Sequence, residues 1–451
     1  MVPLQLETLV LALVHVSLAS SLVVAAGHAL GLHGFERRIA WLGTLAFAVA
    51  AGIVFWETVN GGILQFYSGH VVHDAFTGII LAGVAVAGVL ALAAAGEKPD
   101  SWPSSPGYYG LLPLILYGAF HLAGSSTPAM LLASWMLVSV ATYVAVALPG
   151  EASSRIAATR YIYLGTIATL LLALWVVVVY SGSFLIGPAG AAIAFVGVLA
   201  SLGFKTGVFP FHWWLPSVYA RADGLVVSLV AGAAKAAFVA VLAKALIGLA
   251  ASQPPQTAQA LALGLAVLAV ATMTYGNIAA LTTRDLRSML AYSSIAQTGY
   301  ILVGLAALSY FMASGGPIGL ALAGVALQAA AYAIAKAPLF ALAGETGRPR
   351  LGGATAASTA VLLASLLGIP VLLGFWGKFY LFLPAAQYSL ALVAVALINS
   401  AVSSAYYVRF LRDALQGDEK PSRGVAASLV AAAVITVLAG LAAPLLASAL
   451  A

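Results

Sequence analysis

The sequence is poor in charged residues. Of its 451 residues only 7% are Asp, Glu, Lys or Arg, whereas 63% are hydrophobic. A soluble globular domain carries about 25% charged residues, so a chain this apolar cannot cover a surface that faces water. Lipid must therefore be its main solvent. The formal net charge of +6 is spread too thinly along the chain to form a patch that binds nucleic acid.

Cysteine is absent, which excludes disulfides, cysteine-ligated zinc and iron–sulfur clusters on this chain. The motifs G-x-G-x-x-G and G-x-x-x-x-G-K-[ST], which bind nucleotides, are also missing. We therefore expect no cofactor on this chain and no active site of its own. Residues 1–32 contain no Lys or Arg, so the basic region that begins a cleaved signal peptide is missing too.

Apolar runs of about 20 residues, the length that spans a bilayer, recur along the whole chain. They predict an all-α polytopic membrane protein with about fourteen transmembrane helices. The predicted helices lie at residues 5–30, 38–56, 73–95, 108–124, 128–148, 158–182, 186–205, 224–250, 257–280, 290–312, 317–343, 355–383, 387–408 and 425–450.

Basic residues in the connections predict the orientation. All but five of the 19 Lys and Arg residues follow the odd-numbered predicted helices, and the connections after helices 2, 4, 6, 8, 10 and 12 hold none. The positive-inside rule places the basic side in the cytoplasm and both termini outside. We therefore expect a multi-pass protein of a prokaryotic cell membrane.

The other five basic residues are all lysines inside predicted helices: Lys205, Lys235, Lys244, Lys336 and Lys378. Ionisable side chains are costly in a membrane and usually mark an ion pathway. Arginine keeps its proton in nearly any protein environment, whereas a buried lysine can release it. The lysines therefore predict a proton relay. Lys244, near a helix end, is an auxiliary candidate that could instead extend to the membrane surface.

Lys205 and Lys378 each lie beside a glycine and upstream of a proline, Pro210 and Pro384. Such residues break helices, and transporters place ion sites at broken helices. Five helices separate the two patterns, which predicts two inverted five-helix repeats with breaks in helices 7 and 12. The predicted division is 1–107 (helices 1–3), 108–250 and 257–415 (the repeats) and 425–451 (helix 14).

Four segments resemble one family, the antiporter-like subunits of complex I-type respiratory complexes, above all subunit N. Residues 204–238 are similar to its motif F-K-x-x-x-x-P-F-H-x-W-x-P and the lysine helix that follows. Residues 286–304 resemble L-K-R-M-L-A-Y-S-S-I-A-H-x-G-Y, residues 368–382 resemble G-I-P-P-x-x-G-F-I-G-K-F-Y-L-F, and residues 399–409 resemble N-S-V-V-S-A-Y-Y-Y-L-R.

The resemblance implies a subunit of the membrane arm of an NADH:quinone oxidoreductase or a related complex, with redox cofactors on partner subunits. Family members are thought to join two proton half-channels through a central lysine. By motif, Lys205 matches the input lysine, Lys235 the bridging lysine and Lys378 the output lysine. Lys336 would link Lys235 to Lys378, and His212 could serve a water-mediated relay or the geometry of the helix break. The implied partners are other membrane-arm subunits, lipid, and protons, with Na⁺ as the alternative ion.

Three positions depart from the family. Its helix 5 glutamate, which pairs with the helix 7 lysine, is Met136, its aspartate in W-x-P-D is Ser217, and its helix 10 histidine is Gln297. Because no acidic residue lies well inside a predicted helix, Lys205 has no evident carboxylate partner. His121, on predicted helix 4, is a candidate replacement as a proton carrier.

Three functions therefore stay open on the sequence. The chain could be a proton-translocating subunit driven by redox chemistry elsewhere, a subunit of a multi-subunit cation/proton antiporter, or a scaffold whose channel has decayed. The Ala-Ala-Lys-Ala-Ala-Phe run around Lys235 favours the first function, and Met136 favours the third.

Five histidines gather toward helices 1 to 3: His15, His28, His33, His70 and His73. Their spacing does not fit a zinc motif, so we expect no metal site.

Overall fold

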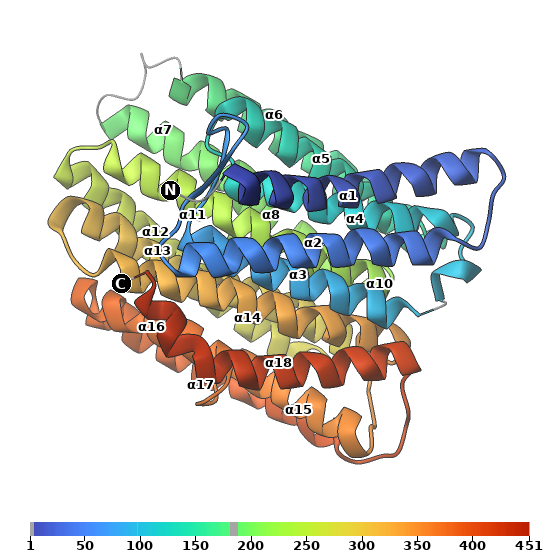
Figure 1. Cartoon of the computed structure of the whole chain (residues 1–451). Helices are drawn as coiled ribbons and strands as arrows, with labels where there is room; N and C mark the ends of the chain where they lie inside the picture. The colour runs from blue at the N-terminus through green and yellow to red at the C-terminus, as the bar shows by residue number, and fades with distance from the viewer. Residues whose placement is uncertain (1–3, 97, 181–187, 451) are drawn as a thin grey trace.

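The computed structural model is a bundle of long helices that run side by side (Figure 1), and it describes residues 4–96, 98–180 and 188–450. Its longest helices are α1 (Leu4–Ala29), α2 (Glu36–Val59), α3 (Ala75–Ala95), α4 (Ser105–Gly124), α5 (Pro128–Ala147), α6 (Ala152–Tyr180), α11 (Lys235–Ala251), α12 (Pro255–Thr282), α13 (Leu286–Ser314), α14 (Ile318–Glu345), α17 (Leu390–Ala414) and α18 (Arg423–Ser448).

In the described part of the chain, 12 helical segments are long and apolar enough to cross a membrane. This confirms the predicted all-α polytopic membrane protein. The two other predicted spans correspond to α4 and to a pair of shorter helices, α15 (Gly353–Leu367) and α16 (Leu373–Tyr388). The count of fourteen, the inverted repeats and the division into segments stay predictions.

The helices that carry the central lysines lie deepest in the bundle. The most apolar 18-residue stretch of segment 224–251 is buried throughout, and those of α13 and α14 are buried over most of their length, whereas those of α1, α6, α17 and α18 each bury about a third. The outer helices expose Leu, Val and Ile side chains, as expected for surfaces in contact with lipid.

A short antiparallel hairpin lies between α2 and α3. Its strands are β1 (Leu64–Phe66) and β2 (Val71–His73), with Leu64 opposite His73. The sequence placed residue 73 at the start of helix 3, but α3 begins at Ala75 because Asp74 caps it. The Asp74 carboxylate accepts a hydrogen bond from the Thr77 backbone N–H at 2.9 Å, and Thr77 reciprocates in a capping box.

The first predicted break is confirmed. After α7 (Pro188–Val198) comes a π-helical turn, η2 (Leu199–Gly203), and then the single turn α8 (Phe204–Thr206). Gly207 ends α8 at φ +86°, a left-handed conformation that favours glycine. The chain then passes Pro210 in an irregular segment before α9 (Trp214–Tyr219) begins.

The second break lies upstream of its predicted position. α15 ends at Gly368, which has φ +95°, and α16 begins at Leu373, so the irregular segment precedes Lys378. The prediction of a break at Pro384 is wrong, since Pro384 lies inside α16. A proline removes one backbone donor, and neighbouring helices can compensate for that in a membrane bundle, whereas a left-handed glycine ends the helix.

A π-helical stretch also leads to Lys235. α10 (Gly224–Val227), η3 (Ser228–Ala234) and α11 follow one another without interruption. Such π-helical turns are rare in proteins overall, but those that occur are often found at functional sites. Both Lys205 and Lys235 lie directly after such a turn.

Candidate functional site

Four of the five lysines are almost completely buried. Lys205 exposes 2% of its surface, Lys235 3%, Lys336 0% and Lys378 4%. They come from α8, α11, α14 and α16. Among the described residues, none of the salt bridges or side-chain hydrogen bonds of these lysines involves a carboxylate.

Lys205 lies in a cage of aromatic rings. Its Nζ is 4.1 Å from the centre of the Tyr143 ring, 4.6 Å from Tyr161, 5.2 Å from Phe238 and 5.8 Å from Trp135. It also donates a hydrogen bond to the Tyr161 hydroxyl at 3.4 Å. Ring faces attract a cation at these distances, so aromatic rings, rather than a carboxylate, surround this ammonium.

Met136 lies on the outer surface of α5 with 53% of its side chain exposed, whereas its neighbour Trp135 is fully buried and faces Lys205. Met136, which the sequence resemblance matches to the family glutamate, is therefore on the surface of this chain.

Lys235 donates to the Ser294 backbone carbonyl at 2.8 Å, and its Nζ lies 4.8 Å from the centre of the Tyr332 ring. The Nζ of Lys336 lies 5.7 Å from the same ring. The two lysines therefore face one tyrosine from different helices.

Lys336 is held by α13. Its Nζ donates to the Leu290 backbone carbonyl at 2.8 Å and also contacts the Ser293 hydroxyl. Because Ser293 and Ser294 are neighbours, one segment of α13 supplies the partners of both central lysines.

Two buried glutamines extend this polar region toward α15. The Gln328 side-chain amide donates to the Gln297 side-chain oxygen at 2.7 Å, and the Gln297 amide donates to the Leu366 carbonyl at 2.9 Å and to the Tyr407 hydroxyl at 3.4 Å. Gln297, which the sequence resemblance matches to a family histidine, is thus part of a neutral pair at the end of α15.

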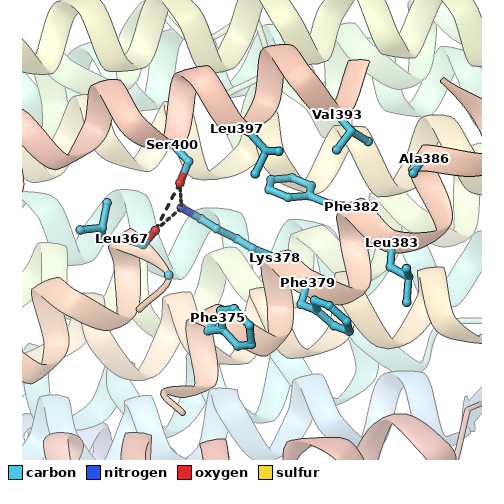
Figure 2. Close-up of a pocket in the computed structure, with 11 residues that line it drawn as sticks. Leu367, Phe375, Lys378, Phe379, Phe382, Leu383, Ala386, Val393, Leu397 and Ser400 are labelled. Atoms are coloured by element: carbon cyan, nitrogen blue, oxygen red, sulfur yellow. Dashed lines mark hydrogen bonds between the residues drawn. The ribbon is translucent and has the colours of Figure 1, made fainter. Parts of the chain in front are cut away.

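Lys378 is the last of the four buried lysines and lies next to the second helix break. Its Nζ donates to the Leu367 carbonyl at 2.8 Å and to the Ser400 hydroxyl at 3.0 Å, and it lies 4.4 Å from the centre of the Tyr300 ring. Figure 2 shows this ammonium at one end of a pocket of about 340 Å³ between α16 and α17, whose other lining residues are mainly apolar.

The other sequence candidates lie away from this series. Lys244 donates to the carbonyls of Ala123 and Ser125 at 2.9 and 3.3 Å, at the C-terminal end of α4. His121 contacts Tyr67 and Tyr117, so it does not replace a carboxylate beside Lys205.

His212 is buried, and its ring packs against Phe209 and Tyr275 with ring centres 5.3 and 4.2 Å apart. These contacts fit the geometry of the helix break, and a relay role for His212 stays a prediction.

The sequence did not reveal the neutral partners of the lysines. The four cage residues lie on three helices between positions 135 and 238, and no spacing rule links them. Ser293, Ser294 and Gln297 lie within the resembling segment 286–304, so that motif could have indicated them.

Comparisons with known proteins support the resemblance. A family model described as NADH:quinone oxidoreductase/Mrp antiporter, TM, matches residues 125–403. NADH-quinone oxidoreductase subunit N of Rubrobacter xylanophilus is 32% identical over 441 residues, which covers 89% of this chain and 88% of the relative. F(420)H(2) dehydrogenase subunit N of Methanosarcina mazei is 30% identical over 335 residues, which covers 68% of this chain and 67% of the relative.

Two solved structures share the fold. A chain of respiratory complex I from Thermus thermophilus superposes with a TM-score of 0.79 at 24% identity, covering 97% of this chain and 99% of that chain. A chain of the Mrp complex from Dietzia sp. DQ12-45-1b gives a TM-score of 0.84 at 18% identity, covering 99% and 97%. The chain therefore belongs to the family of transmembrane subunits that NADH:quinone oxidoreductases and Mrp antiporters share.

Proposed function

We propose that the chain is an antiporter-like membrane-arm subunit of a complex I-related redox complex, and that it carries protons along Lys205, Lys235, Lys336 and Lys378. One observation carries the proposal: four buried lysines without carboxylates lie on adjoining central helices, and polar groups of α13, α15 and α17 hold three of them. The relatives named subunit N support the same assembly.

The two central lysines suit proton transfer because they face the same ring. Two ammonium groups at one site repel each other, so a proton that arrives on Lys235 favours proton release from Lys336. Tyr332 and the carbonyls of α13 can hold either ammonium in turn. Such alternation moves charge from α11 to α14 without any acidic residue.

The pair Gln297 and Gln328 lies between Lys336 and Lys378 and limits how a proton could pass from one lysine to the other. A side-chain amide donates and accepts hydrogen bonds but does not take up or release a proton near neutral pH. A proton that passes from Lys336 to Lys378 therefore needs hydroxyl groups or water beside Gln297 and Gln328. The hydroxyl groups of Tyr407, which contacts Gln297, and of Ser400, which contacts Lys378, would serve this step. Tyr300 is a further candidate, because its ring lies beside Lys378.

In the proposed orientation the ends of the helices with the basic connections face the cytoplasm of a prokaryotic cell, and both termini lie outside. The partners are further membrane-arm subunits and lipid, and the redox cofactors lie on partner subunits.

The test is redox-driven proton pumping by the whole complex in proteoliposomes. Lys235→Ala and Lys378→Ala should each lower the number of protons pumped per electron pair at least tenfold, while exposed Lys420 serves as the control in Lys420→Ala. Unchanged pumping in both test variants would favour the scaffold. Na⁺-dependent proton exchange that needs no redox substrate and is lost in the same variants would favour the cation/proton antiporter.

A further inference from the structure

Two histidines and a tyrosine meet beside the β1–β2 hairpin, away from the lysines. The Tyr67 hydroxyl lies 3.1 Å from His121 Nε2 and 3.4 Å from His15 Nε2. Tyr67 belongs to the turn of the hairpin, His15 to α1 and His121 to α4. Three separate parts of the chain thus converge on one oxygen atom.

Both imidazole rings are oriented through their other nitrogen. His15 Nδ1 lies 2.7 Å from the Leu11 carbonyl and His121 Nδ1 lies 2.8 Å from the Tyr117 carbonyl. A carbonyl only accepts, so the proton of each neutral ring lies on Nδ1, and each Nε2 keeps a free lone pair. Metal-binding histidines are typically oriented in this way, with the second nitrogen bound to a carbonyl or a carboxylate.

The single hydroxyl of Tyr67 lies between two ring nitrogens that each present a lone pair. Tyr67 has a single hydroxyl proton and can donate it to only one of the two Nε2 atoms at a time. A cation between the three atoms would satisfy both nitrogens and the oxygen together.

The distances suit a small divalent ion. Zinc binds histidine nitrogen at about 2.0–2.1 Å in tetrahedral geometry, so two of its ligand atoms lie about 3.3 Å apart. The distances of 3.1 and 3.4 Å from the Tyr67 oxygen to the two nitrogens are close to that separation. Imidazole with an oxygen ligand favours Zn²⁺ or Cu²⁺ over Mg²⁺ and Ca²⁺.

We propose that His15 and His121, with the Tyr67 oxygen as a third and weaker ligand, bind one Zn²⁺ ion, and that water completes its coordination. His15 lies on the exposed side of α1, whereas His121 is buried. The ion would fasten the hairpin to α1 and α4. The proposal revises the expectation of no metal site, because sequence spacing does not show which histidines meet. It does not depend on proton transfer through the lysines.

The test is a Zn²⁺ titration of the full chain in lipid nanodiscs, with competition against a chromophoric chelator. We expect one site per chain, with a Kd that weakens at least tenfold in His15→Ala and in His121→Gln. His70→Ala is the matched control, because His70 lies in the same hairpin and contacts Thr127 instead. His28→Ala/His33→Ala removes the other histidine pair, whose ring centres are 5.7 Å apart. Both controls should retain the affinity.

Zn²⁺ affinity that survives in His15→Ala, or that disappears in His28→Ala/His33→Ala, would overturn the proposal. Since His121→Gln could disturb folding, Cu²⁺ provides a second measurement. The electron paramagnetic resonance spectrum of the Cu²⁺-loaded wild type should show coupling to two imidazole nitrogens, reduced to one in His15→Ala. Coupling to a single nitrogen in the wild type would contradict the two-histidine site.

Discussion

At the scale of single residues, Lys205 shows how a cation can be kept in a membrane without an acid. Removing a charged group from water costs several kcal/mol even after the protein relaxes. A desolvated cation–π contact returns about 2 kcal/mol or more, so the four rings of the cage together return a free energy of the same order as this cost. The ammonium is tolerated rather than strongly bound, which suits the proton release that we propose for Lys205.

Two substitutions distinguish the need for a positive charge at position 205 from the need for a group that can release a proton. Lys205→Met should leave the melting temperature of the chain unchanged or higher, because sulfur packs well against aromatic rings and the uncompensated cation is gone. Lys205→Arg keeps a cation that cannot release its proton. Both variants should lower redox-driven pumping at least tenfold in the assembled complex. Wild-type pumping in the Arg variant would show that only the charge matters.

His73 should make stability depend on pH. It is fully buried against Phe66 and Phe120, with ring centres 6.1 and 4.5 Å away, and burial lowers its pKa well below the ordinary value. In the unfolded chain the His73 imidazole takes up a proton below a pH of about 6.5, whereas in the folded chain it stays neutral. The free energy of unfolding is therefore highest above that pH and falls as the pH drops, by up to about 1.4 kcal/mol per pH unit.

Melting temperatures of the wild type and of His73→Leu between pH 7.5 and 5 test this prediction. The wild type should lose more stability on acidification than the variant, while the two differ least at pH 7.5. Parallel curves would mean that His73 takes up a proton in the folded chain as readily as in the unfolded chain.

At the scale of elements, Lys244 stabilises the end of a helix. The last carbonyls of a helix lack partners within it and carry partial negative charge, and Lys244 binds those of Ala123 and Ser125. Lys244→Met should cost about 1–2 kcal/mol of stability and speed amide hydrogen exchange across residues 120–127. Pumping by the variant should stay normal. Lost pumping with unchanged exchange would instead make Lys244 a member of the relay.

Glycines set the contact between α14 and α16, which carries Lys378. A Cβ atom at Gly324 would lie 2.5 Å from the Leu381 backbone nitrogen, closer than real Cβ atoms come. Gly324→Ala should therefore destabilise the chain by about 1–3 kcal/mol or more and lower pumping, because α16 must move. Gly248→Ala in α11 is the matched control, since a Cβ atom there meets nothing within 4 Å. A melting temperature of Gly324→Ala equal to that of the control would contradict this packing.

The sequence predicted these elements unequally well, for physical reasons. Hydrophobic length located the helices, and the break at Pro210 followed from local chemistry. The break at Gly368 was misplaced to Pro384, because a proline tolerated by its neighbours and one that ends a helix look alike in sequence. The lysines were found because charge is rare in this chain, but the rings and amides around them are common residue types brought together only by packing.

At the scale of the whole molecule, arginines at one end of the bundle hold helix ends as well as marking a side of the membrane. Arg287 donates to the Ala222 carbonyl at 3.2 Å, just before the start of α10, and to the Ala343 carbonyl at 3.1 Å, near the end of α14. Arg409 likewise donates to the carbonyls of Leu281 and Thr283, at the end of α12. These arginines of the basic connections are therefore fixed parts of the fold.

Because the chain has no cysteine, a single introduced thiol reports the orientation without background. Gln416 and Ser314 are both exposed and lie in or beside connections that the charge pattern places on opposite sides of the membrane. An impermeant maleimide should label Ser314→Cys in intact cells and Gln416→Cys only in inverted vesicles, since the proposed orientation puts the basic connection after α17 in the cytoplasm. The opposite pattern would reverse the direction in which Lys205 and Lys378 take up and release protons. Labelling of both positions from one side would instead mean that the number of spans between them is even.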